Sequence, residues 1–306
     1  TPQVTVGISV SGVPTFFAKI FRISSVTINA TAVAAIDNPA GGGGAVSVLG
    51  IKPWVIPNFD PLQPATGSAP PNCATHASGA PAFPLIDRTT GRLCSPGNSV
   101  LGGNVGAGFN LVLGDPHLLP TAGTSSGITN LSFYVRQSPG STLVPACGGL
   151  GSDVYSTAIA GADATAVTTG ANTTVNLTSS SSPGTINPLT QTAVRCLIHQ
   201  NGAGTAGQDT LSFTFGAGGF NLWPVGGTNN PIAAARGLAV SRSDSLVTVP
   251  IYDVTFNQGA SPTIRPLCAT AGCTGTVNVP IIGFAQIFIQ QTPCNRYPDS
   301  RKDEAP

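Results

Sequence analysis

Three histidines are the side chains of this chain best suited to proton transfer near neutral pH: His76, His117 and His199. They are far apart in the sequence and have unlike neighbours. His117 ends the stretch Gly114-Asp115-Pro116-His117, which places a carboxylate close to an imidazole and is the most catalytic-looking tetrapeptide of the chain. Asp-Pro is also a common way to open a turn, so we interpret this stretch as a turn.

The motifs of several enzyme and cofactor classes are absent. The chain has no Gly-x-Ser-x-Gly elbow of the kind that presents a catalytic serine. The glycine-rich stretch at 216–219 lacks the following Lys-Ser/Thr of a phosphate loop, and Cys73 to His76 is only half of a haem-attachment motif. We therefore expect no enzyme, no metal and no cofactor. A hydrolase that assembles a dispersed Ser/His/Asp set around His117 or His199 is the minor alternative.

Seven cysteines in a lysine-poor chain fit an oxidising compartment, where disulfides persist. The candidate pairs are Cys73 with Cys94, Cys147 with Cys196, and Cys268 with Cys273, which leaves Cys294 over. Six paired cysteines already allow about 15 arrangements, so the sequence does not set this connectivity. A metal site is the weaker interpretation, because no second Cys or His pair stands at zinc-finger spacing from Cys268 and Cys273.

The composition excludes several kinds of protein. Only 8% of the 306 residues are charged, against about a quarter in ordinary globular domains. With 13 basic and 12 acidic residues, the chain lacks the clustered positive charge that nucleic acids need, so we expect no nucleic-acid partner. Because 41% of the residues are apolar and charges are scarce, we expect part of the surface to be covered by a permanent protein partner.

The elements that would position these side chains are mainly strands. Val4, Val6, Ile8 and Val10 alternate with polar or small residues, and strand patterns recur at 26–30, 125–135, 173–178, 210–216, 246–256 and 277–290. Short helices are predicted at 16–21, 188–200 and 231–237. Prolines recur from 53 to 84, and we expect them to exclude interior helix and central strand there. The predicted fold is mainly β (β-rich α+β), with long Gly/Pro-rich loops and a few short helices.

Three segments carry a family resemblance. The first runs from Val13-Pro14-Thr15-Phe16-Phe17 to Ala34, and the second is Lys52-Pro53-Trp54-Val55-Ile56-Pro57. The third joins 247–253 to 279–285 and Phe288. Together they resemble the extracytoplasmic part of the TadE/TadG-like proteins of tight-adherence (Flp-type) pilus assembly in bacteria. The resemblance brings no catalytic residue, and it spans 13–290 with only loose similarity at about 60–245.

The resemblance implies a non-enzymatic structural or assembly protein at the periplasmic or extracellular face of a bacterial membrane. Its partners would be other envelope proteins in a larger complex, and it would associate with the membrane through an upstream anchor or a membrane-bound partner. Residues 1–306 would form one TadG-like region, or two β subdomains at about 1–120 and 121–296 followed by a polar tail at 297–306. The alternative is an accessory scaffold subunit on the periplasmic face of another membrane complex, such as an electron-transport or photosynthetic one.

Six aromatic side chains are candidates for the core or for an interaction surface. They are Phe16, Phe17, Trp54, Trp223, Phe284 and Phe288. Each tryptophan adjoins a proline, which favours a side chain that pins a loop onto the core or onto a partner. A carbohydrate-binding adhesin with Trp54 or Trp223 as its stacking platform is the less favoured alternative.

Overall fold

The fold is rich in β-structure, as the sequence predicts. The computed structural model describes residues 3–14, 25–35, 45–59, 84–88, 109–120, 122–125, 128–137, 141–142, 154–177, 183–200, 207–216, 219–230, 243–255, 266–269 and 273–290. Strands make up 43% and helices 12% of the residues that can be interpreted, which confirms the predicted fold class.

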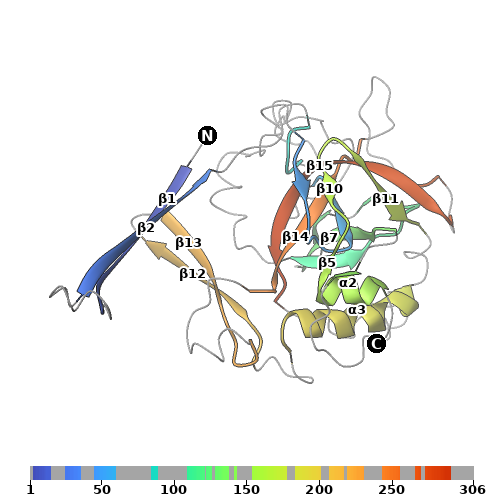
Figure 1. Ribbon diagram of the computed structural model, residues 1–306. Helices are drawn as coiled ribbons and strands as arrows, with labels where there is room; N and C mark the ends of the chain where they lie inside the picture. The colour runs from blue at the N-terminus through green and yellow to red at the C-terminus, as the bar shows by residue number, and fades with distance from the viewer. Residues whose placement is uncertain are drawn as a thin grey trace.

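A seven-stranded mixed sheet forms the body of the molecule (Figure 1). Its strand path is β11 (Asn172–Asn176), β15 (Thr276–Phe288), β14 (Leu246–Tyr252), β4 (Trp54–Pro57), β7 (Ile128–Val135) and β5 (Asn110–Leu113), and β6 (Ala122–Ser125) also pairs with β7. The two-stranded sheets are β1 (Gln3–Pro14) with β2 (Ser25–Ala35), β3 (Ser47–Val48) with β10 (Val167–Thr168), β8 (Ser141–Thr142) with β9 (Ala162–Asp163), and β12 (Thr210–Gly216) with β13 (Gly219–Val225).

The long antiparallel pair β14–β15 contributes the centre of the core. Val247, Val249 and Ile251 alternate along β14 and are all buried, as the period of a half-buried strand predicts. Val279 and Ile281 of β15 are fully buried and join the same apolar cluster. The alternating sequence pattern of these two strands therefore corresponds to the interior of the fold.

The expectation that residues 53–84 contain no central strand is wrong at its beginning. β4 is a central strand, parallel to β14 on one side and antiparallel to β7 on the other, and all four of its residues are buried. The prolines are tolerated because Pro53 precedes the strand and Pro57 ends it. At these positions the missing backbone N–H interrupts few hydrogen bonds between strands. Pro53 contributes its carbonyl, which accepts a hydrogen bond from Arg136 N at 3.0 Å, and Asn58 N supplies the donor to Tyr252 O at 3.0 Å. Residues 60–83 lie outside the described part of the chain.

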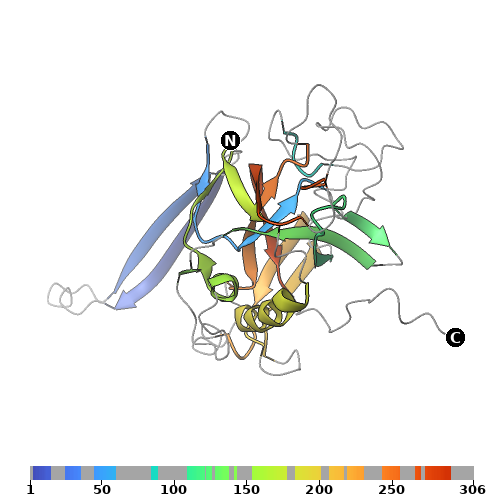
Figure 2. The same cartoon turned by 90° about the vertical axis from the view of Figure 1, so that its right-hand side faces the viewer.

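Two helices, α2 (Val154–Ala160) and α3 (Pro183–Leu197), pack against each other on one side of the large sheet (Figures 1 and 2). The sequence predicts α3 from Pro188, but the helix begins at Pro183, so Pro188 lies inside it. Its later turns bury Ala193, Val194 and Leu197. These three residues lie on one face of the helix and belong to the same apolar cluster as the buried residues of the sheet. The sequence did not predict α2, and the helical candidates at 16–21 and 231–237 lie outside the described residues.

The large sheet closes on itself at one end. β11 begins the strand path, and the end of β7 lies four strands away from it, yet Arg136 bridges to Val175 and Gln137 N donates to Thr174 O at 2.9 Å. On the other side, Arg136 N donates to Pro53 O at 3.0 Å. The closure leaves no free sheet edge at this point and brings the side chain of Arg136 inside the fold.

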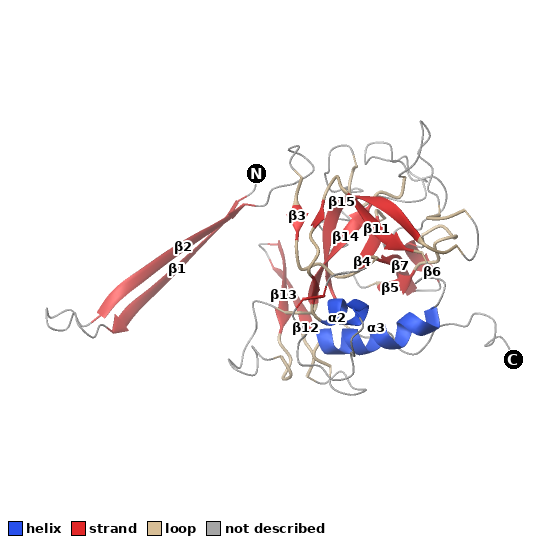
Figure 3. Ribbon diagram, turned by 45° about the vertical axis from the view of Figure 1, so that its right-hand side comes forward, coloured by secondary structure: helices blue, strands red, loops and turns tan. Residues whose placement is uncertain are grey.

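The β1–β2 hairpin is a long ribbon that extends away from the large sheet (Figure 3). Its register pairs Gln3 with Ala35 at one end and Pro14 with Ser25 at the other, with an irregularity between Val10 and Val13. No Asp, Glu, Lys, Arg or His occurs in either strand. Because neither strand pairs with another described strand, each has an outer edge of backbone donors and acceptors.

Candidate functional site

His117, the first histidine candidate of the sequence analysis, lies in a turn as predicted. Asp115 Oδ1 accepts a hydrogen bond from His117 N at 3.1 Å and lies 2.5 Å from its ring atom Nδ1. Leu118 N donates to Asp115 O at 3.1 Å, which closes the turn. All these contacts are local, so the imidazole and carboxylate stabilise the turn that contains them.

His199, by contrast, is surrounded by groups from distant segments. It follows the end of α3, and its side chain is 14% exposed. Nε2 lies 3.3 Å from Oδ2 of Asp244, and Nδ1 lies 3.8 Å from Oδ2 of Asp209. The second distance exceeds that of a hydrogen bond, so the contact with Asp209 is Coulombic. The two carboxylates differ sharply in environment, because Asp209 is fully buried and the Asp244 side chain is 72% exposed.

Asp209 is the centre of a hydrogen-bonded cluster at the root of the β12–β13 hairpin, by which we mean the point where the chain enters β12 and leaves β13. Its Oδ1 accepts hydrogen bonds from Gly227 N at 3.0 Å and Asn230 Nδ2 at 3.0 Å. Its Oδ2 accepts from Asn230 Nδ2 at 2.9 Å and from the hydroxyl of Ser243. Both oxygens of this buried carboxylate therefore have hydrogen-bond donors within the chain.

The same geometry decides what this cluster can do chemically. The Ser243 hydroxyl donates to Asp209 and not to the imidazole, so these residues do not form the Ser–His–Asp order of a hydrolase. Contact with Asp244 raises the pKa of His199 above its ordinary value; burial opposes this effect and Asp209 adds to it. The cluster can therefore bind and release a proton, and it joins three segments that are remote in sequence.

Lys52 is a second buried charge that the sequence did not single out as functional. Its Nζ donates to the carbonyl of Ile159 at 2.8 Å and to that of Gly161, at the C-terminal end of α2. An ammonium group is favourable there because the last carbonyls of a helix carry partial negative charge. Burial lowers the pKa of Lys52 to about 8, and the carboxylate of Asp244 offsets part of that effect. Lys52 therefore holds α2 against the start of β4.

We expect Lys52→Met to change how stability depends on pH. The lowered folded-state pKa, about 8 against the ordinary 10.5, means that the unfolded chain binds more protons between these values. The wild-type protein should therefore gain stability from about pH 8 to about pH 10, whereas the variant lacks this contribution. Denaturant unfolding at these two pH values measures the difference in free energy of unfolding between the two proteins. Ionisation of the tyrosines cancels in this difference, because both proteins contain them. A difference that stays constant with pH would contradict the assignment.

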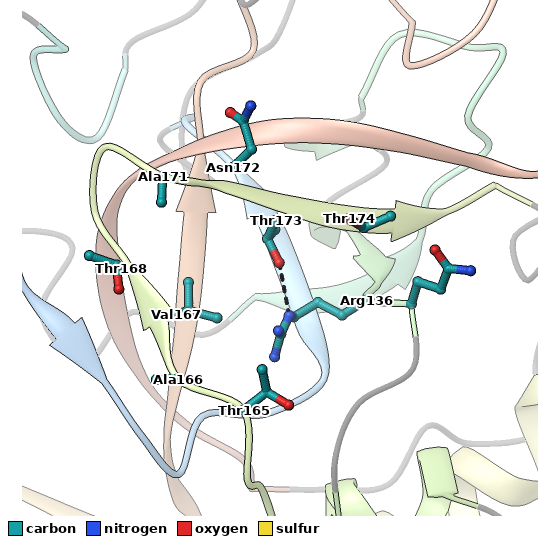
Figure 4. Close-up of a pocket in the computed structure, with 10 residues that line it drawn as sticks. Arg136, Thr165, Ala166, Val167, Thr168, Ala171, Asn172, Thr173 and Thr174 are labelled. Atoms are coloured by element: carbon teal, nitrogen blue, oxygen red, sulfur yellow. Dashed lines mark hydrogen bonds between the residues drawn. The ribbon is translucent and has the colours of Figure 1, made fainter.

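Arg136 lines a polar pocket at the point where the sheet closes (Figure 4). The pocket has a volume of about 310 Å³. Its other lining residues are Gln137, Thr165, Ala166, Val167, Thr168, Ala171, Asn172, Thr173 and Thr174. Arg136 is 6% exposed, and its guanidinium forms an ion pair with Asp163 and donates from Nε to Thr173 Oγ1 at 3.0 Å. Burial lowers the pKa of Arg136, and the Asp163 carboxylate counteracts this.

The ion pair makes the charge of this pocket close to neutral. Asp163 is fully buried and also accepts a hydrogen bond from Thr165 N at 2.8 Å. Arg136 therefore already has its carboxylate partner within the chain, and an anionic ligand would have to compete with it. The hydroxyl and amide groups around the pair could hydrogen-bond a neutral polar molecule, but no described aromatic side chain lines the pocket as a stacking surface. We interpret the Arg136–Asp163 pair as the structural link between β7 and β9.

The aromatic candidates have different environments. Trp54 is 3% exposed, its Nε1 donates to the Tyr155 hydroxyl at 3.1 Å, and its ring centroid lies 5.8 Å from that of Phe133. Such a buried ring has no free face for a ligand. Phe284 is half-buried and packs against the core, and Phe288 is half-buried. The side chain of Trp223, and Phe16 and Phe17 altogether, lie outside the described residues.

The structure contains a disulfide between Cys268 and Cys273, one of the three candidate pairs. Cys196 is also disulfide-bonded, and Cys73, Cys94, Cys147 and Cys294 lie outside the described residues. In the part of the chain that the structure describes, no three His, Cys, Asp or Glu side chains are grouped as a metal site. No helix within that part is long and apolar enough to span a bilayer.

No motif or spacing in the sequence singles out Arg136, Asp163, Asp209 or Asp244. One indication was present: in a chain with so few charges, Arg136 directly follows a predicted strand and Asp209 directly precedes another. A charged residue at a strand end becomes buried when the adjoining loops fold over it, and it then needs a partner. The sequence does not show which partner, because those contacts span 27 residues for Arg136 with Asp163 and 34 for Ser243 with Asp209.

The chain was compared with protein-family models, curated proteins and solved structures, and none of the three comparisons yields a match.

Proposed function

We propose that this chain is a non-enzymatic structural or assembly protein of the bacterial cell envelope, related to the TadG-like proteins it resembles, and that it acts through protein–protein contacts. The observation that carries the proposal is the β1–β2 hairpin. It combines two uncharged strands with outer edges that pair with no other described strand. Natural proteins protect such edges with charges, prolines or covering segments, and an unprotected edge is suited to pairing with another chain.

The buried charges support a structural role. Lys52, Arg136 and Asp209 each have partners within the chain, at the end of α2, at the sheet closure and at the root of β12–β13. These charges join segments of the fold. The Cys268–Cys273 disulfide is consistent with an oxidising compartment such as the periplasm or the cell exterior.

The runner-up is an accessory scaffold subunit bound to the periplasmic face of another membrane complex, such as an electron-transport or photosynthetic one. It would use the same kind of surface, so only the identity of the partner separates the two. The carbohydrate-binding alternative is weakened, because the buried ring of Trp54 cannot act as a stacking platform. The hydrolase alternative is weakened by the Ser243–Asp209 hydrogen bond, which directs the hydroxyl away from the His199 imidazole.

Site-specific photocrosslinking in the native host tests the proposal. A photoreactive residue is placed at Thr5 in β1 or at Thr31 in β2, and at exposed Thr274 as the matched control away from the hairpin. We expect hairpin-specific adducts with envelope proteins. Pilus-assembly components among them support the TadG-like assignment, and subunits of another membrane complex support the runner-up. Equal adducts from Thr274, or none from either strand, would contradict a role for the hairpin.

A further inference from the structure

His199 has a backbone conformation that non-glycine residues rarely adopt. Its φ is 58°, in the left-handed region. Two contacts hold it there: His199 N donates to Cys196 O at 3.1 Å, and its carbonyl accepts a hydrogen bond from Asn229 Nδ2 at 2.9 Å. These contacts fix the backbone of His199 just after α3, and from there its ring lies close to Asp209 and Asp244.

The imidazole cannot satisfy both of its carboxylate neighbours while it is neutral. A neutral imidazole carries one N–H, so one ring nitrogen faces a carboxylate with a lone pair. Nε2 lies 3.3 Å from Asp244, and Nδ1 is buried, has no hydrogen-bond partner and lies 3.8 Å from Asp209. After protonation both nitrogens are donors, and each faces a negative charge. The geometry therefore favours the imidazolium on both sides of the ring.

The two carboxylates belong to segments that the imidazole can join to α3. Asp209 immediately precedes β12 and binds Gly227 and Asn230 just after β13, which makes it the root of that hairpin. Asp244 lies two residues before β14. A protonated His199 thus connects the end of α3 to both the hairpin root and the start of a central strand.

We propose that His199 is a pH-dependent latch, which holds the C-terminal end of α3 against the root of the β12–β13 hairpin when the imidazole is protonated and loosens this contact when it is neutral. Other charges near the cluster are Lys52, whose ammonium interacts with Asp244, and Arg195, one helical turn earlier on α3. The inference does not depend on the proposed function, because it concerns contacts within the chain.

The sign of the pH dependence follows from the direction of the shift. The pKa of His199 is raised above its ordinary value of 6.5, first by Asp244, with burial opposing and Asp209 assisting. The folded state therefore holds the proton more tightly than the unfolded chain. The latch contributes fully below about pH 6.5 and is lost as the pH rises through the folded-state pKa.

The test compares the wild-type protein with His199→Asn. Asparagine tolerates the left-handed backbone region and does not titrate, so it removes the switch and keeps the loop conformation. Amide hydrogen exchange at 197–200 and 207–209, corrected for intrinsic rates, is measured at about pH 5 and about pH 7.5, on either side of the ordinary histidine pKa and below that of Lys52. We expect wild-type protection to fall several-fold between these two pH values as the imidazole loses its proton, and that of His199→Asn to stay constant.

An NMR titration of the assigned His199 ring keeps the proposal testable if His199→Asn fails to fold. Asp244→Asn removes the exposed carboxylate and should move the His199 pKa back toward its ordinary value. Amide protection in this variant should then change less between the two pH values than it does in the wild-type protein. The latch is overturned if the wild-type ring titrates at or below the ordinary value. It is also overturned if wild-type protection does not change with pH, or if His199→Asn shows the same pH dependence.

Discussion

Replacing Arg136 with methionine is expected to lower the free energy of unfolding by about 3–5 kcal/mol, the usual range for breaking a buried ion pair. The variant leaves the carboxylate of Asp163, which is fully buried, without its guanidinium partner. It also removes the donor to Thr173 Oγ1. Denaturant unfolding with the disulfides intact measures the loss.

The chain offers a matched control for this variant. Arg88 pairs with Asp253 at 3.4 Å, but its side chain is 40% exposed, so Arg88→Met should cost less than about 1 kcal/mol. The double variant Arg136→Met/Asp163→Asn should recover part of the lost stability, because it removes the unpaired charge and keeps an acceptor for Thr165 N. Equal losses from the two arginine variants, or no recovery in the double variant, would show that the buried pair does not hold the sheet closure.

Replacing Trp54 with alanine should also cost about 3–5 kcal/mol, as truncation of a large buried aromatic side chain does. The ring is 3% exposed, and its loss would leave a cavity beside Phe133 and deprive the Tyr155 hydroxyl of a donor. All four residues of β4 are buried, so the strand depends on the packing of its side chains as well as on its pairing with β14 and β7.

Thermal and denaturant unfolding measure the effect, and near-ultraviolet circular dichroism reports whether aromatic packing persists. Trp54→Phe should lose less, because it keeps an aromatic ring in the core and loses the indole N–H. Leu49→Ala serves as the control: Leu49 is 68% exposed, so its truncation should change stability little. Wild-type stability in Trp54→Ala would mean that Trp54 does not support the core.

Local patterns predicted much of the fold. Strands lie where alternation of apolar residues indicates them, at β1, β2, β7, β11, β12, β14 and β15. The turn at Asp115 was predicted for the same reason, since its contacts are made within a few residues. The failures were also local in origin. Proline spacing argued against β4, and α2 is only seven residues long, too short to give a clear period.

The sequence by itself therefore determined the class of this fold and the scarcity of charge that makes each buried charge consequential. Only the tertiary structure decided which charges meet: Arg136 with Asp163, Lys52 with the end of α2, and His199 with two carboxylates from separate segments. The physical reason is range. Alternation and turn chemistry act between neighbouring residues, whereas a buried charge acquires its partner from the strand register and from the closure of the sheet, which exist only once distant segments have paired.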